Sequence, residues 1–200
     1  MKNVVFDLGG VLVDFDPERM INDNFPPEYH DIIYKNVFRS VHWLNMDKGT
    51  ETVEEALDNM LPNIPEDARD KMREVVLDRE GQMPPLTEMT PIINALHEGG
   101  YRLFVLSNCA KWLHEFKNTI PSNEYFEGFF VSADYNVVKP DRIIYEMFLE
   151  KFNLKAEDCL FIDDSPANTE AAEKLGFKVF CFKDMDFEGL KQYISQLTKE

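Results

Sequence analysis

Five short runs of apolar residues stand out along the chain, and none alternates cleanly between polar and apolar positions. They cover residues 3–7, 102–106, 128–132, 159–163 and 178–182. Continuous apolar runs of this length are typical of strands buried on both faces of a parallel sheet. The pattern therefore predicts a five-stranded parallel sheet.

Helical periodicity separates the later strands. We predict helices over residues 110–118, 141–152, 166–175 and 187–198. Ser165 and Pro166 form a favourable helix start, since a hydroxyl can cap the first turn and proline suits the first helical position. Gly176 is a typical stop for the same helix. Strands that alternate with helices predict a doubly wound α/β fold.

A long segment separates the first two strands and breaks this alternation. It is predicted to be helical over 17–25, 27–38, 40–47, 52–60 and 66–80, with prolines between the helices. A crossover helix over 88–99 then leads back into the sheet. We therefore expect an α/β core domain built from residues 1–14 and 86–200, with an inserted helical cap domain over residues 15–85.

The charge balance restricts the partners of the protein. The chain has 37 acidic against 21 basic residues, a formal net charge of −16. Such a field repels nucleic acid and anionic membranes, so we expect neither as a partner. The three cysteines form no CxxC pair, and no apolar stretch is long enough to span a membrane. We expect a cytoplasmic protein that is a monomer or a small homo-oligomer.

Polar residues follow the predicted strands where a ligand binds in such sheets. They are Asp7, Ser107 with Asn108, Lys139, and Asp163 with Asp164. Paired carboxylates suit a hard cation, most often Mg²⁺. A serine followed by free backbone N–H groups suits a phosphate, and a carboxylate beside a metal-bound phosphoryl group can attack it. These residue types together predict phosphate chemistry.

Four segments resemble the ordered motifs of the haloacid dehalogenase superfamily: FDLGGVLVD (6–14), VLSN (105–108), VKP (138–140) and FIDDSPAN (161–168). The resemblance covers essentially the whole chain and implies a Rossmann-like core. The position of the insertion resembles the helical-cap subclass. The FDLGGV start and the DKG turn (47–49) most resemble the small sugar-phosphate phosphatases. The resemblance thus implies a Mg²⁺-dependent phosphatase that acts on a small phosphorylated metabolite.

The resemblance also implies individual roles. Asp7 would attack phosphorus and contact the metal, and Lys139 would neutralise charge on Asp7 and the phosphate. Ser107 and the Asn108 backbone would hold the phosphoryl oxygens. Metal ligands would be Asp7, the Gly9 carbonyl, Asp164 and, directly or indirectly, Asp163. Asn168 would orient Asp164.

One position departs from the family pattern. Related phosphatases have a second aspartate, two residues after the nucleophile, that serves as general acid and base; here the residue is Gly9. General acid–base catalysis contributes about 10²–10⁴-fold. A substrate with a good leaving group, such as a sugar 1-phosphate, would suffer less. We hypothesise that Asp14, Asp16 or a residue of the cap partly replaces the missing aspartate.

Several alternatives remain open at this point. An aspartate at a strand end is often only a turn residue or a helix cap. The same nucleophile could attack carbon in a haloacid dehalogenase, which needs no metal. Loss of turnover would leave a protein that only binds phosphorylated metabolites, and a phosphomutase is a further possibility. Aromatic residues of the cap, such as Trp43, fall at core-like helical spacings, whereas Lys111 and Trp112 are candidates for lining the substrate site.

Overall fold

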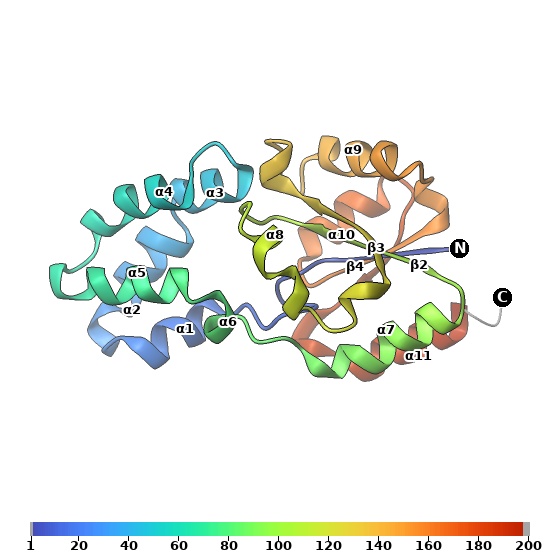
Figure 1. Cartoon of the computed structure of the whole chain (residues 1–200), viewed down its shortest axis with the longest axis horizontal. Helices are drawn as coiled ribbons and strands as arrows, with labels where there is room; N and C mark the ends of the chain where they lie inside the picture. The colour runs from blue at the N-terminus through green and yellow to red at the C-terminus, as the bar shows by residue number, and fades with distance from the viewer. Residues whose placement is uncertain (1, 198–200) are drawn as a thin grey trace.

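The computed structural model describes residues 2–197 and contains one five-stranded, all-parallel sheet. The strand order is β3-β2-β1-β4-β5. The strands are β1 (Asn3–Phe6), β2 (Arg102–Ser107), β3 (Phe126–Val131), β4 (Cys159–Asp163) and β5 (Lys178–Cys181). Their carboxyl ends point toward a separate group of helices (Figure 1). The predicted doubly wound α/β fold is confirmed.

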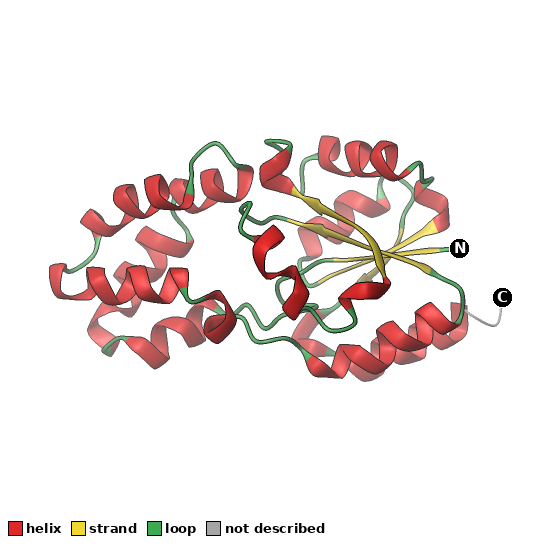
Figure 2. Ribbon diagram, in the orientation of Figure 1, coloured by secondary structure: helices red, strands yellow, loops and turns green. Residues whose placement is uncertain are grey.

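Helices cover both faces of the sheet (Figure 2). One face carries α7 (Thr90–Glu98) and α11 (Phe187–Leu197), and the other carries α9 (Arg142–Phe152) and α10 (Pro166–Glu173). Successive residues of β1 serve opposite faces: Val4 and Phe6 belong to one apolar cluster, and Val5 belongs to the other. Because both faces are buried, the strands are apolar without alternation.

Two elements of the core differ most from their predicted bounds. The third strand was predicted over 128–132, but it begins at Phe126 and ends at Val131. A register irregularity at Leu103/Phe104 leaves Glu127 as an extra residue, and its carboxylate pairs with Arg102 at 2.7 Å on the surface. That charge hid the start of the strand. The helix predicted over 110–118 shortens to α8 (Leu113–Phe116), followed by one turn of 3-10 helix.

Between β1 and α7 the chain forms six α-helices that stand to one side of the sheet (Figure 1). They are α1 (Pro17–Asn24), α2 (His30–Ile33), α3 (Val41–Lys48), α4 (Val53–Met60), α5 (Arg69–Leu77) and α6 (Arg79–Gln82). The helix predicted over 66–80 breaks at Asp78, whose carboxylate caps α6 by accepting the Gly81 N–H at 3.1 Å. The helix predicted over 27–38 is likewise divided into shorter helical turns. Within residues 2–197, no helix combines the length and the apolar character needed to cross a bilayer.

Two linkers connect these helices to the core, and they run side by side in opposite directions. The Asp14 N–H donates to the Pro84 carbonyl at 2.8 Å, and the Leu86 N–H donates to the Leu12 carbonyl at 2.9 Å. The Arg19 guanidinium contacts both linkers through the carbonyls of Asp14 (3.1 Å) and Gln82 (3.2 Å). We infer that residues 15–85 form the cap expected from the sequence and that these paired linkers are its hinge.

A second contact between cap and core is formed by the DKG turn at the end of α3. The Ser132 hydroxyl donates to the Asp47 carbonyl, and the Asn136 amide donates to the Lys48 carbonyl at 3.0 Å. Gly49 ends α3 with φ +77°, and a Cβ there would lie 2.2 Å from the Ala133 carbonyl oxygen. The turn therefore packs directly on the backbone that follows β3.

We predict that Gly49→Ala destabilises the protein more than Gly100→Ala does. Both glycines have φ +77°, but a Cβ at Gly100 would have no neighbour within 4 Å. The left-handed conformation alone should cost about 1–2 kcal/mol in each variant. The clash with Ala133 should cost Gly49→Ala about 1–3 kcal/mol more. Equilibrium unfolding in urea measures both losses, and equal losses would contradict the close packing.

Candidate active site

The carboxyl group of Asp7 lies at the end of β1 and is almost fully buried, since the residue is only 7% exposed. Its Oδ1 atom accepts the Leu8 N–H at 2.7 Å and contacts the Lys139 ammonium at 2.8 Å. Among the described residues, no group donates a hydrogen bond to Oδ2. The side chain is therefore held through one oxygen and presents the other for chemistry.

Lys139 links the ends of three strands. Its Nζ atom lies 2.8 Å from Asp7 Oδ1 and 2.7 Å from Asp163 Oδ2, and donates to the Leu106 carbonyl at 3.1 Å. The Asn108 side chain holds the Lys139 backbone: the amide donates to its carbonyl at 2.9 Å and accepts its N–H at 2.7 Å. This second role of Asn108 was not predicted from the sequence. The predicted contact of Lys139 with Asp7 is present.

Asp163 is fully buried and its carboxylate is saturated with donors. Oδ1 accepts the Ser165 N–H at 2.8 Å and the Asn168 amide at 3.0 Å, while Oδ2 accepts the Asn168 amide at 3.0 Å and the Lys139 ammonium at 2.7 Å. A carboxylate offers about four lone-pair sites. The prediction that Asn168 orients Asp164 is therefore wrong, because its amide reaches the buried last residue of β4 and not the exposed residue after it.

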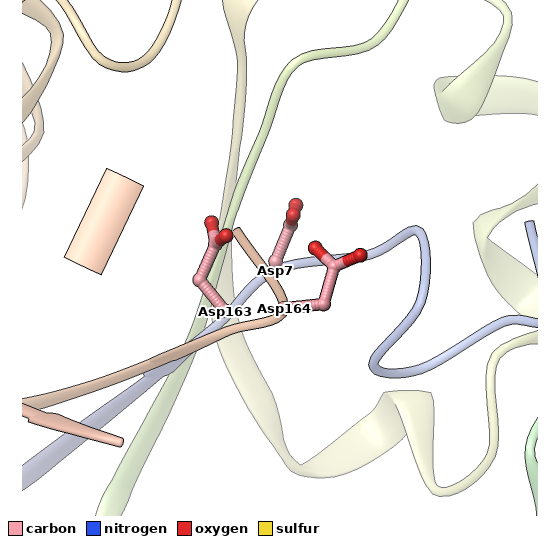
Figure 3. A group of neighbouring side chains, drawn as sticks. All are labelled: Asp7, Asp163 and Asp164. Atoms are coloured by element: carbon pink, nitrogen blue, oxygen red, sulfur yellow. The ribbon is translucent and has the colours of Figure 1, made fainter. Parts of the chain in front are cut away.

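Asp164 completes a cluster of three carboxylates. One oxygen each from Asp7, Asp163 and Asp164 can be chosen so that all three lie within 4.8 Å of one another. Figure 3 shows that the three groups, from the ends of β1 and β4, converge on the same region. Gly10, with φ +71°, lets Asp164 approach the turn after β1, because a Cβ there would lie 2.6 Å from Asp164 Oδ2.

The cluster holds more negative charge than Lys139 neutralises. Burial raises the pKa of Asp7 to about 8; Lys139 opposes this shift, whereas Asp163 and Asp164 add to it. Burial lowers the pKa of Lys139, but the adjacent Asp163 and Asp7 outweigh this effect and raise it. Lys139 contacts both Asp7 and Asp163, so its one ammonium leaves part of the negative charge of the three clustered carboxyl groups uncompensated. A divalent cation would compensate it, and carboxylate oxygens suit Mg²⁺.

A cavity of about 50 Å³ lies between the residues at the carboxyl ends of β1 and β2 and those of the cap. The core contributes the residues that directly follow β1 and those at the end of β2: Leu8, Gly9, Ser107 and Asn108. Aromatic rings form much of the rest, from Phe15, Trp43 and Trp112. Trp112 thus lines the cavity as predicted, whereas Lys111 lines a neighbouring cleft instead. The phosphate cradle at Ser107 and Asn108 stays a prediction, and the Cys109 N–H that follows donates to the Ser132 hydroxyl at 2.8 Å.

The proposed substitutes for the missing acid, Asp14 and Asp16, do not line the cavity. Asp14 pairs with Arg19 at 3.2 Å, and Asp16 caps α1 by accepting the Arg19 N–H at 3.0 Å. Instead, Asp47 from the end of α3 lines it. In the sequence, Asp47 stands out only as part of the DKG turn. The available signal was an aspartate two residues before a glycine at a helix end, which is too common to identify a functional group.

Similar proteins share this architecture. The sesquiterpene phosphatase astK of Aspergillus oryzae is 24% identical over 176 residues, which cover 88% of this chain and 86% of the relative. The solved structure of a predicted HAD-like family hydrolase from Porphyromonas gingivalis is 26% identical with a TM-score of 0.75, and covers 100% of this chain and 98% of its own. A HAD family enzyme from Bacteroides thetaiotaomicron, in complex with magnesium and inorganic phosphate, is 26% identical with a TM-score of 0.72; the match covers 90% and 93% of the two chains.

The family comparison agrees with the residues that form the site. The haloacid dehalogenase-like hydrolase family matches residues 1–176, a range that includes Asp7, Ser107, Lys139 and Asp164. That range runs from before β1 to just beyond α10 and spans the cap as well. This protein is a member of the haloacid dehalogenase-like hydrolases.

Proposed function

We propose that the protein is a Mg²⁺-dependent phosphatase that hydrolyses a small phosphorylated metabolite through an aspartyl-phosphate on Asp7. The observation that carries the proposal is the cluster of Asp7, Asp163 and Asp164 beside a buried lysine. Asp7, Asp164 and the Gly9 carbonyl would hold the ion. Asp163 supports them through Lys139, because its own lone pairs are taken. The relative named for phosphatase activity and the structure with magnesium and phosphate support the same chemistry.

Different residues of the chain have different roles in the proposed reaction. Bound Mg²⁺ would neutralise the phosphoryl charge and favour the ionised form of Asp7. Oδ2 of Asp7, the oxygen without a hydrogen bond, attacks phosphorus while Oδ1 stays fixed by Leu8 and Lys139. Ser107 and the backbone after it orient the phosphoryl oxygens. The cap excludes bulk water around the cavity, which strengthens each electrostatic contact within it.

The cavity lining restricts the leaving group. Phe15, Trp43 and Trp112 contribute aromatic surface to it. Aromatic rings pack against the apolar face of a sugar ring, against an aryl group or against an isoprenoid chain. We propose a sugar phosphate as the substrate, as the sequence resemblance implies, and we rank aryl and isoprenoid phosphates next. A direct test measures phosphate release from one compound of each class, with Mg²⁺ and with a chelator. Mg²⁺-dependent release would support the proposal, and release that is unaffected by chelation would contradict it.

Two alternatives give different results in the same assay. A haloacid dehalogenase would release halide without a metal and leave every phosphate intact. The uncompensated negative charge around Asp7 disfavours this reading, because attack on carbon requires no cation there. A protein that only binds phosphorylated metabolites would show saturable binding and no release. The Asp7 oxygen that accepts no hydrogen bond and the lysine contact favour turnover over binding alone.

We predict that Mg²⁺ raises the melting temperature more at pH 8.5 than at pH 5.5. The folded-state pKa of Asp7, about 8, lies above its ordinary value of 3.8. Its contribution to stability is therefore complete below pH 3.8 and is lost as the pH rises through 8. Mg²⁺ binds the ionised form and competes with the proton. At about 100 times Kd it contributes about 2.7 kcal/mol, or about 5–10 °C for a chain of this size.

The control separates this effect from general screening of an acidic protein. Sodium chloride at matched ionic strength should not reproduce the stabilisation at pH 8.5. In Asp7→Asn the Mg²⁺-induced shift should become small and nearly independent of pH, because the titrating ligand is absent. An equal shift at both pH values in the wild-type protein would contradict the proposed role of Asp7 as a metal ligand.

A further inference from the structure

Hydrolysis through Asp7 requires a proton donor for the leaving group, and the core does not supply one. In-line attack places the leaving oxygen on the side of phosphorus opposite Asp7, which is the side of the cap. An alkoxide leaves slowly unless it receives a proton. Lys139 is held by two carboxylates and a carbonyl, and Asp163 only accepts hydrogen bonds. The core groups around the nucleophile therefore supply no free acid to the leaving group.

Building on the proposed function, we propose that Asp47 of the cap is the general acid and base of the reaction. Its side chain lines the same cavity as Gly9, Ser107 and Asn108. Besides Asp47, only Cys109 among the described lining residues carries a titratable group, and burial raises the pKa of that thiol well above its usual range. Asp47 is thus the one carboxyl group of the cavity, and it enters from the side that the leaving group must face.

The core fixes the position of Asp47. Its carbonyl accepts the Ser132 hydroxyl, and the next carbonyl, of Lys48, accepts the Asn136 amide. The turn after it cannot retreat without losing the close approach of Gly49 to Ala133. These contacts attach the end of α3 to the core after β3, far in sequence from the linkers that form the hinge. When the cap is docked on the core, the Asp47 carboxyl group therefore lies at the cavity. When the cap opens, the carboxyl group moves away from it.

The absence of a side chain at Gly9 fits this arrangement. A Cβ at Gly9 would lie 3.2 Å from the Cβ of Phe15, so a larger residue would crowd that ring. Phe15 in turn stacks on Trp43, with 6.0 Å between ring centroids, and the Trp43 side chain forms a hydrogen bond with the Asp47 carboxyl. Gly9 thus leaves room for Phe15, which packs on Trp43, and Trp43 in turn contacts Asp47. The group that this turn lacks is supplied from the cap.

The surroundings of Asp47 favour its protonated form. Burial raises its pKa well above the usual range, and the charge of Asp7 adds to the effect. The Trp43 hydrogen bond and the charge of Lys139 oppose it. The Cys109 thiol, neutral in its buried position, faces the same cavity. A neutral carboxyl group near a phosphoryl anion is the state that a general acid requires.

The proposed steps balance in atoms and charge. In the first, the Asp7 oxygen bonds to phosphorus, the bond from phosphorus to the leaving oxygen breaks, and that oxygen takes the Asp47 proton and departs as an alcohol. In the second, a water oxygen attacks phosphorus and its proton passes to the Asp47 carboxylate. The bond from phosphorus to Asp7 then breaks, which regenerates the Asp7 carboxylate and releases inorganic phosphate.

The test compares two aryl phosphates that differ in the acidity of the leaving group. Asp47→Asn should lower kcat for phenyl phosphate by about 10²–10⁴-fold. It should lower kcat for 2,4-dinitrophenyl phosphate less than about 10-fold, because that phenolate needs no proton to leave. The basic limb of the kcat–pH profile for phenyl phosphate should disappear in the variant. Asp47→Glu should recover part of the loss, and Asp70→Asn, an exposed cap position, should change neither substrate.

A second variant tests the assignment without altering the carboxyl group. Trp43→Phe keeps an aromatic ring beside Phe15 but removes the hydrogen-bond donor that favours ionised Asp47, so the basic limb should move to higher pH. Equal losses for both aryl phosphates in Asp47→Asn, or an unmoved limb in Trp43→Phe, would overturn the assignment while phosphatase activity itself stood. If the wild-type enzyme hydrolysed neither compound with Mg²⁺, the proposed function would fail first, and this inference with it.

Discussion

Replacement of Asp7 by asparagine should abolish phosphate release, with a loss of at least about 10⁴-fold in kcat. An amide oxygen is a poor nucleophile, and an amide cannot form and release an acyl phosphate as a carboxylate does. The variant should still fold, because asparagine keeps an oxygen to accept the Leu8 N–H. Lys139 also retains its bond to Asp163 at 2.7 Å. Steady-state phosphate release, together with circular dichroism, measures both expectations.

Two observations make this result specific to the nucleophile. Acid-quenched wild-type enzyme should carry a phosphoryl group on the peptide that contains Asp7, and the variant should carry none. Asp70→Asn makes the same chemical change at an exposed cap position and should leave the rate unaltered. If Asp7→Asn retained more than about a tenth of the activity, attack by a different group, such as a water molecule, would replace the proposed covalent mechanism.

The buried sheet was predictable because a strand covered on both faces must be apolar throughout. Cys159–Asp163 was predicted with its observed bounds, and β1, β2 and β5 each differ by a single residue at one end. The start of β3 was not predictable, because Glu127 lies in a bulge and reaches solvent. A local apolar pattern cannot represent an extra residue that neither face buries.

The site likewise contains residues that the sequence predicts and residues that it does not. Asp7, Ser107, Lys139, Asp163 and Asp164 follow from the rule that parallel strands gather their carboxyl ends. The structure brings four of them, Asp7, Lys139, Asp163 and Asp164, into one cluster. Asn168 was assigned to the wrong neighbour, because adjacent aspartates at a strand end differ only in which one is buried. Asp47 could not be found, because its position depends on how α3 docks after β3 rather than on nearby sequence.

The second large effect should come from Lys139→Met, which removes a cation that contacts two buried carboxylates. Lys139 is 3% exposed, and its ammonium contacts Asp7 and Asp163 at 2.8 and 2.7 Å. Breaking a buried pair from one side leaves an uncompensated charge, which costs about 3–5 kcal/mol. The free energy of unfolding, measured in urea without Mg²⁺ at pH 7, should fall by that amount. Lys35→Met, at an exposed position, should change it by less than about 0.5 kcal/mol.

A double variant identifies the cause of this loss. Asp163→Asn removes the carboxylate that takes most of the lysine charge, so in the Lys139→Met background it should restore part of the stability. In the wild-type background the same change should destabilise, because it breaks the Lys139 contact at 2.7 Å. Opposite signs in the two backgrounds give a coupling free energy of about 1–3 kcal/mol. Additive losses would instead mean that Lys139 acts through the packing of its stem, and its charge would then have no part in holding Asp7 ready to attack.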